Sequence, residues 1–139
     1  MATTATQASP RLIAIALPGI PESVPVARLR VRAALGLHGL GEYADDAEII
    51  TSELVTNAVQ HVCGNGTKTI GVTLTAAGSP AAVTVAVSDS SPHGPIRRDM
   101  PAGSEQGRGL RLVEALSAHW GWRREDSGKA VFAVLVREA

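Results

Sequence analysis

The strongest constraint on the fold is a pair of predicted hairpins in the second half of the chain. Residues 67–76 alternate apolar and polar side chains, as a strand with one buried face does, and residues 82–87 form a second apolar run after a turn. Residues 120–125 and 130–137 repeat this arrangement near the end of the chain. Because consecutive strands joined by a turn pair antiparallel, we expect a sheet that is mostly antiparallel.

Three stretches have helical spacing of apolar residues. The first begins at Ser23, a residue suited to capping a helix, and ends within residues 36–41. The second covers residues 45–62 and opens on Asp45-Asp46-Ala47-Glu48, which has the capping-box pattern of an acid followed three residues later by Glu. The third follows a glycine pair and lies within residues 107–118.

With a further strand at residues 11–17, the order is strand, two helices, two strands, loop, helix, two strands. This order predicts an α+β fold, a two-layer sandwich of a mostly antiparallel sheet with helices on one face. The length of 139 residues suits one domain, which we place at residues 11–139 after a loose N-terminus at residues 1–10. Aromatic residues make up only 3% of the chain, so its core must consist mostly of Ala, Val, Leu and Ile.

Composition argues against several classes of protein. The 13 basic and 13 acidic residues give no net charge, which is unfavourable for a nucleic-acid-binding module. The single cysteine, Cys63, can form neither an internal disulfide nor a Cys-rich zinc site. No signal peptide and no membrane-spanning run is apparent, so we expect a cytoplasmic protein without a membrane partner.

Polar residues recur every four positions along the second predicted helix, at Glu53, Asn57 and His61. This spacing stacks them on one side of a helix, at the edge of its apolar face. There an acid and an amide could form the floor of a ligand cleft. The alternative is a structural role at a polar boundary, and for His61 the structural interpretation is the favoured one.

Two further features carry possible chemistry. Asp89 follows the strand at residues 82–87 and is either a turn residue or an acceptor for an exocyclic amine such as that of adenine. Gly107-Arg108-Gly109 before a helix is either a simple turn or a set of free backbone N–H groups suited to phosphate. Residues 92–107 between these features lack periodicity, and a loop of this length is usually functional or disordered. The arginines Arg28, Arg30 and Arg32 are better interpreted as a solvated helix face than as a phosphate site.

Three features of the chain, in this order, resemble the N, G1 and G2 boxes of the GHKL (Bergerat-fold) ATPases. They are Glu53 with Asn57 for the N box, Asp89 for the G1 box, and Gly107 with Gly109 for the G2 box. Within that superfamily the chain most resembles the anti-sigma factor serine/threonine kinases, in particular the standalone ATP-binding regulators common in actinobacteria. Glu-Leu-Val-Thr-Asn-Ala-Val-Gln-His at residues 53–61 is the most specific part of the resemblance. Trp120-Gly121 and Gly128-Lys129 support it.

The resemblance implies a role for each of these residues. Asn57 would hold Mg²⁺ through its side-chain oxygen, and Glu53 would be the general base toward a protein hydroxyl. Asp89 would accept from the amino group of adenine, and residues 93–106 would be a lid. Backbone N–H groups would cradle the phosphates of ATP, namely those of Gly107, Arg108, Gly109 and Leu110.

The resemblance also implies partners. Such a kinase binds a sigma factor in one state and phosphorylates an anti-anti-sigma (STAS-domain) antagonist in another, and relatives commonly form homodimers. Two departures keep a second interpretation open: Asp89 is followed by Ser-Ser-Pro instead of x-Gly-x-Gly, and Ala130 stands where relatives tend to have Thr. The alternative is a non-catalytic, nucleotide-binding module that sequesters a partner without transferring phosphate.

Overall fold

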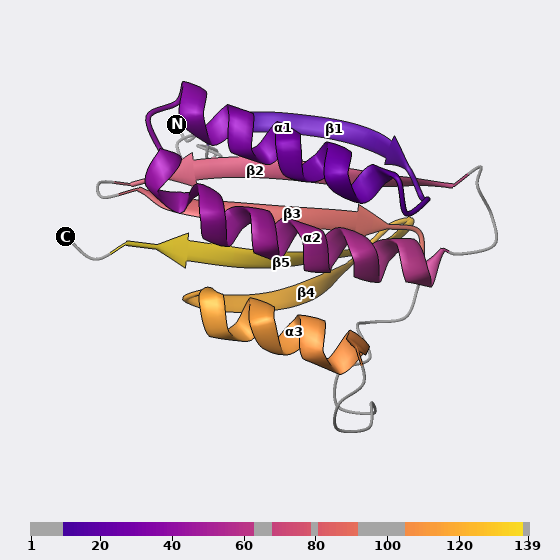
Figure 1. Cartoon of the computed structure of the whole chain (residues 1–139). Helices are drawn as coiled ribbons and strands as arrows, with labels where there is room; N and C mark the ends of the chain where they lie inside the picture. Colours follow the sequence, from indigo (N-terminus) through magenta and orange to yellow (C-terminus); the bar gives the residue numbers. More distant parts are fainter. Residues whose placement is uncertain (1–9, 63–67, 79–80, 92–104, 138–139) are drawn as a thin grey trace, which may run out of the picture.

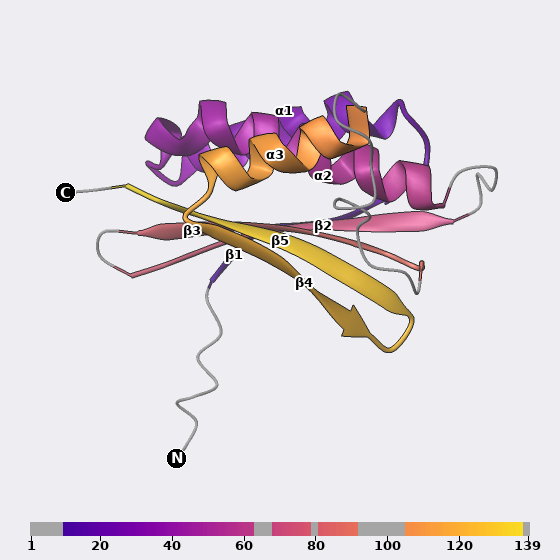
Figure 2. The ribbon, with the colours of Figure 1, turned by 90° about the horizontal axis from the view of Figure 1, so that it is seen from below.

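The computed structural model describes residues 10–62, 68–78, 81–91 and 105–137, with the backbone alone for residues 105–109. The described residues form an antiparallel sheet and helices on one of its faces (Figures 1 and 2). The strands are β1 (Arg11–Pro18), β2 (Thr69–Ala77), β3 (Ala82–Asp89), β4 (His119–Glu125) and β5 (Gly128–Val136). The helices are α1 (Ser23–Leu37), the short 3₁₀ helix η2 (Gly41–Tyr43), α2 (Ala44–His61) and α3 (Glu105–Leu116).

The predicted fold class is confirmed. The sheet has five strands in the order β1-β2-β3-β5-β4, and each neighbouring pair is antiparallel. Both predicted hairpins are present, β2 with β3 and β4 with β5. The second hairpin turn is tighter than expected, because Glu125 pairs with Gly128 and only Asp126 and Ser127 remain between the strands.

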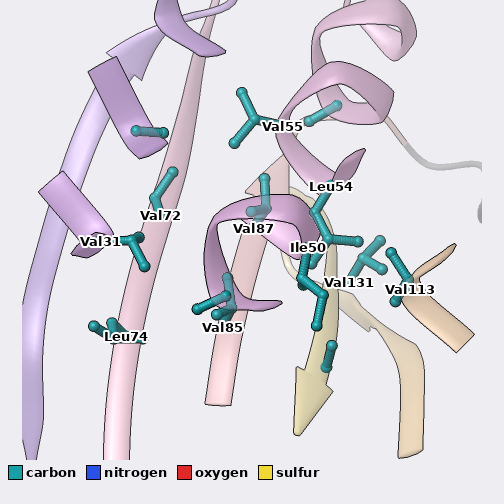
Figure 3. Close-up of a cluster of buried hydrophobic side chains, with 14 of the residues drawn as sticks. Val31, Ile50, Leu54, Val55, Val72, Leu74, Val85, Val87, Val113 and Val131 are labelled. Atoms are coloured by element: carbon teal, nitrogen blue, oxygen red, sulfur yellow. The ribbon is translucent and has the colours of Figure 1, made fainter. Parts of the chain in front are cut away.

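The core lies between the helices and the inner face of the sheet. On β3 the residues Val83, Val85 and Val87 are fully buried and alternate with half-buried ones, as expected for a strand with one covered face. Figure 3 shows the middle of this core, where valines of the sheet meet Ile50, Leu54 and Val55 of α2. Apart from Tyr43, the core residues are Ala, Val, Leu and Ile, as the low aromatic content predicts.

The predicted capping box of α2 is wrong. The helix begins at Ala44, directly after η2, and its N-cap Tyr43 makes no side-chain capping hydrogen bond. Glu48 instead accepts hydrogen bonds from Arg28 and Arg32 of the neighbouring helix α1 (Figure 1). The side chain of Glu48 is thus bound to α1, and a contact between helices takes the place of the local cap.

The predicted cap of α1 is wrong for a similar reason. Ser23 is the first residue of α1, not its N-cap, and its Oγ donates to the carbonyl oxygen of Pro18 at 2.6 Å. Its hydroxyl is therefore buried at the junction of β1 and α1. The third helix also differs, because it begins at Glu105 and already includes the glycines expected to precede it. Among the helices that the structure describes, none is long and apolar enough to cross a bilayer.

Candidate functional site

Asp89 is the last residue of β3 and lies on the covered face of the sheet, in the same alternation as Val85 and Val87. Its side chain is only 1% exposed. The backbone N–H of Ser91 donates to Oδ1 at 2.7 Å, so the turn interpretation of Asp89 is correct as far as it goes. The stronger partner is a residue that sequence analysis did not assign to the site.

That partner is Lys129, which lies opposite Asp89 in the register of β3 and β5. Its Nζ donates to both carboxylate oxygens, at 3.0 Å to Oδ1 and 2.9 Å to Oδ2. Lys129 is 1% exposed, which makes this a buried ion pair. A lysine can be buried in this way only when its charge is paired and its N–H groups are satisfied.

His61, at the end of α2, completes the cluster. Its Nδ1 lies 2.7 Å from Lys129 Nζ and 3.8 Å from Asp89 Oδ2. The first distance is a hydrogen bond and the second is too long for one. Because an ammonium group can only donate, Nδ1 of His61 is the acceptor of this hydrogen bond. His61 therefore has the structural partner that the favoured interpretation of this residue predicts.

The groups around Asp89 shift its pKa in opposite directions. Burial alone would raise the pKa of this carboxyl, because it disfavours the charged form. The hydrogen bonds that Lys129 and the Ser91 N–H donate, with the charge of Lys129, oppose this effect, and the pKa of Asp89 lies below its ordinary value. Asp89 is therefore an anion, and both of its oxygens already accept hydrogen bonds.

Asn57 and Glu53 lie one and two turns before His61 on α2. The Nδ2 atom of Asn57 is buried and has no hydrogen-bond partner among the described residues. A buried amide without a partner is costly, which is what a residue kept for a ligand would show. A half-turn of the amide can present its oxygen to the same place, so Asn57 fits the predicted role as a Mg²⁺ ligand.

No group of His, Cys, Asp and Glu side chains in the described part of the chain could hold a metal ion by itself. Mg²⁺ usually needs only one or two protein oxygens when phosphate oxygens and water supply the others. A magnesium ion at Asn57 would thus depend on a bound phosphate ligand.

Glu53 lines an open groove of about 420 Å³ between α1 and α2, together with Ile49 and Ser52. The same groove is lined by an exposed charge cluster, in which Arg28 and Arg32 pair with Glu48, and Arg32 also with Asp45. The arginines are about half exposed, as their interpretation as a solvated face predicts, but each has an acidic partner.

The glycine pair lies within the first two turns of α3. Gly107 is the third residue of the helix, so its N–H is still among the groups without an intrahelical acceptor. Gly109 and Leu110 are the fifth and sixth residues, and their N–H groups belong to the internal hydrogen bonds of the helix. Phosphate binding by these residues and by Arg108 stays a prediction, and for the later amides it requires the first turn to unwind. Residues 92–104, most of the predicted lid, lie outside the described residues.

Asp89 and His61, two residues that the sequence pattern marks as candidates, thus lie together in the structure, and Lys129 joins them. The missed residue had one available signal, since it is one of only two lysines in the chain and follows Gly128 between the two strands of the last predicted hairpin. Only the pairing of β3 with β5, which sequence periodicity cannot specify, places it opposite Asp89.

Residues 17–135 match the family model described as the histidine kinase-like ATPase domain. No curated protein matches the chain.

Proposed function

Because the match covers residues 17–135, this chain belongs to the histidine kinase-like ATPase domain family, and we propose that it is an ATP- and Mg²⁺-dependent serine/threonine protein kinase of the anti-sigma type. In this proposal it binds a sigma factor in one state and phosphorylates an anti-anti-sigma STAS protein in another. Family membership implies an ATP-binding domain, whereas substrate and partners depend on the site itself.

The observation that carries the proposal is the arrangement along α2. Asn57 has a buried amide atom without a partner among the described residues, and Glu53 lies one turn earlier at an open groove. A nucleotide could thus bind beside Asn57, and a protein substrate could reach Glu53 from solvent. The two would then meet along one helix. Phosphoryl transfer needs mainly this kind of positioning, with neutralisation of charge.

The proposed reaction uses the chain's own residues as follows. The carboxylate of Glu53 takes the proton of a serine or threonine hydroxyl, and the oxygen attacks the γ-phosphorus of ATP. The bond from this phosphorus to the β–γ bridging oxygen breaks, and ADP leaves. Asn57 would hold a magnesium ion through its side-chain oxygen, and the ion would neutralise phosphate charge when bound.

A first experiment tests nucleotide binding. Calorimetric titration with ATP, with and without Mg²⁺, should show binding that depends on Mg²⁺ and is weakened about tenfold or more by Asn57→Ala. Thr56→Ala, which removes a neighbouring polar side chain from the same helix, is the matched control and should bind normally. Absence of binding to wild type at millimolar ATP would overturn the enzyme proposal.

A second experiment tests catalysis. Wild type should incorporate phosphate from ATP into a STAS partner, and Glu53→Gln should not, while both bind the partner equally. Glu42→Gln, an acid on η2 away from this groove, is the control and should retain transfer.

One observation favours the alternative of a non-catalytic module that binds nucleotide and sequesters a partner. The acceptor expected to recognise adenine, Asp89, is already occupied by Lys129. If ATP binds but neither wild type nor Glu53→Gln transfers phosphate to a bound partner, this alternative replaces the kinase.

A further inference from the structure

The Lys129 ammonium is fully satisfied inside the protein. Its three N–H donors have three acceptors, the two oxygens of Asp89 and Nδ1 of His61, at 2.7 to 3.0 Å. On the carboxylate, Oδ1 accepts from both Lys129 and the Ser91 N–H. One lone-pair site remains on Oδ2, but the Asp89 side chain is only 1% exposed. A ligand cannot reach this acceptor while the cluster keeps this packing.

The backbone around the pair leaves little room for another arrangement. At Gly128, just before Lys129, a Cβ atom would lie 1.9 Å from the carbonyl oxygen of Asp89. The two strands are therefore in close contact at the site, and Asp89 and Lys129 are direct neighbours across them. The pairing of the two strands holds both backbones in place, so the carboxylate is freed by a rotation of the lysine side chain and not by a shift of its backbone.

We propose that Lys129 is an internal competitor of the nucleotide: its ammonium occupies Asp89 in the nucleotide-free protein, and the amino group of adenine binds there only after Lys129 Nζ leaves Asp89 and His61. This inference rests on the proposed function, because it takes Asp89 as the acceptor for adenine. It adds that the affinity and base preference of the site are set by a residue of β5. The apparent affinity for ATP is then the affinity of the site without Lys129, multiplied by the fraction of molecules in which Lys129 is displaced.

Lys129 and the amino group of adenine do not bind Asp89 equally strongly, and nucleotide affinities can measure the difference. A charged ammonium with three acceptors is held more strongly than a neutral amino group with one or two. If Lys129 stayed at the site and gave up only one of its three acceptors, the freed N–H would favour a base with a carbonyl oxygen at the same position, such as hypoxanthine. If Lys129 leaves, the free carboxylate favours adenine. ATP and inosine triphosphate therefore distinguish the two arrangements.

The test is titration of wild type, Lys129→Met and Lys68→Met with ATP and with inosine triphosphate. Methionine keeps an unbranched side chain of similar length but cannot donate to Asp89. Lys68 is the only other lysine and is exposed, so its substitution is the matched control. We expect Lys129→Met to bind ATP about tenfold more tightly than wild type, with a smaller gain for inosine triphosphate, and Lys68→Met to match wild type.

Three results would count against the inference in different ways. Unchanged or weaker ATP binding by folded Lys129→Met would overturn it and leave the proposed function intact. Preference of wild type for inosine triphosphate over ATP would show that Lys129 stays in place, and would also overturn it. Absence of nucleotide binding by all three proteins would overturn the proposed function, and the inference with it.

A second measurement does not depend on the variant folding. Lysine acetylation of wild type, followed by mass spectrometry, reports both lysines in one sample, with Lys68 as the internal reference. Without nucleotide, Lys129 should react at least tenfold more slowly than Lys68 because it is buried. Saturating ATP should change the rate at Lys129 and leave Lys68 unchanged, whereas an unchanged Lys129 rate would overturn displacement.

Discussion

Within the described part of the chain, two clusters in which carboxylates meet basic side chains differ in their surroundings. The buried cluster consists of Asp89, Lys129 and His61, and both side chains of its ion pair are 1% exposed. The exposed cluster consists of Arg28, Arg32, Glu48 and Asp45 on α1 and α2, where the arginine side chains are 46–47% exposed. The exposed cluster has more charges and more ion pairs, yet we expect the buried cluster to matter more.

Solvent is the reason for this difference. An exposed pair gains little, typically about 0–1 kcal/mol, because water and salt screen it and long side chains must be ordered. A buried pair also gains little over an apolar replacement, but removal of one partner leaves a buried charge uncompensated, at a cost of about 3–5 kcal/mol. The comparison therefore predicts large single-substitution effects at the sheet and small ones between the helices.

The largest effect should come from Asp89→Asn. This change leaves the ammonium of Lys129 buried among neutral groups, and we expect the free energy of unfolding to fall by about 3–5 kcal/mol. Urea denaturation followed by circular dichroism measures this loss. A loss below about 1 kcal/mol would mean that Lys129 reaches water in the variant, and that the two clusters are energetically alike. Because Asp89→Asn affects folding as well as the proposed adenine contact, its nucleotide binding must be judged on folded protein.

The second largest effect should be a recovery of stability when both charges of the buried ion pair are removed. The double variant Asp89→Asn/Lys129→Met contains no uncompensated charge, so it should be more stable than Asp89→Asn by about 1–3 kcal/mol. A double-mutant cycle, with each single variant measured by the same denaturation, gives the coupling energy. The corresponding cycle with Arg28→Met and Glu48→Gln should give a coupling below about 1 kcal/mol. Equal coupling in the two cycles would contradict the role assigned to burial.

The features of the fold that depend on near neighbours in the chain could be predicted from the sequence. The strands, the hairpins and the three helices follow from periodicities of apolar residues, which depend on near neighbours in the chain. They are present within a few residues of the expected bounds. From the same patterns Asp89, Asn57 and Glu53 could be selected as a candidate site.

Contacts between distant segments could not be predicted in this way. Lys129 joins the site only because β5 inserts between β3 and β4 in the sheet, a choice that no local pattern specifies. Glu48 has the sequence signature of a capping box, but arginines from α1 bind it, and this tertiary contact overrides the local preference. In both cases the chemistry of a residue was clear from the sequence and its partner was not.

A third prediction concerns acid. Asp89 and Glu48 both have a pKa below the ordinary value. For Asp89 burial raises the pKa, and the hydrogen bonds from Lys129 and the Ser91 N–H, with the charge of Lys129, more than reverse this; for Glu48 the hydrogen bond from Arg32 is the main cause. A lowered folded-state pKa stabilises the native state fully above the unfolded-state pKa, about 3.9 for Asp and 4.3 for Glu. This stability is lost as the pH falls through the lower folded-state pKa.

Denaturation between pH 7 and pH 2 should therefore show stability that falls below about pH 4 to 5. Added 1 M NaCl should remove the part due to Glu48, because exposed charges are screened, and should leave most of the part due to Asp89. The variant Glu48→Gln at low salt is the control for this assignment, since it lacks the Glu48 part from the start. Complete loss of the pH dependence in high salt would place Asp89 among the solvated charges.

The smallest effect should come from Glu48→Gln. Gln keeps the size of the side chain, but Arg28 and Arg32 donate to different oxygens of Glu48, and the single amide oxygen of Gln can replace only one of them. We expect a loss in the free energy of unfolding of about 1 kcal/mol or less at low salt, which should disappear at 1 M NaCl. A loss of several kcal/mol that persists in salt would mean that the exposed cluster is as tightly coupled as the buried one. Glu48 would then hold α1 against α2 through its charge, and the groove that Glu53 lines would depend on this ion pair for its shape.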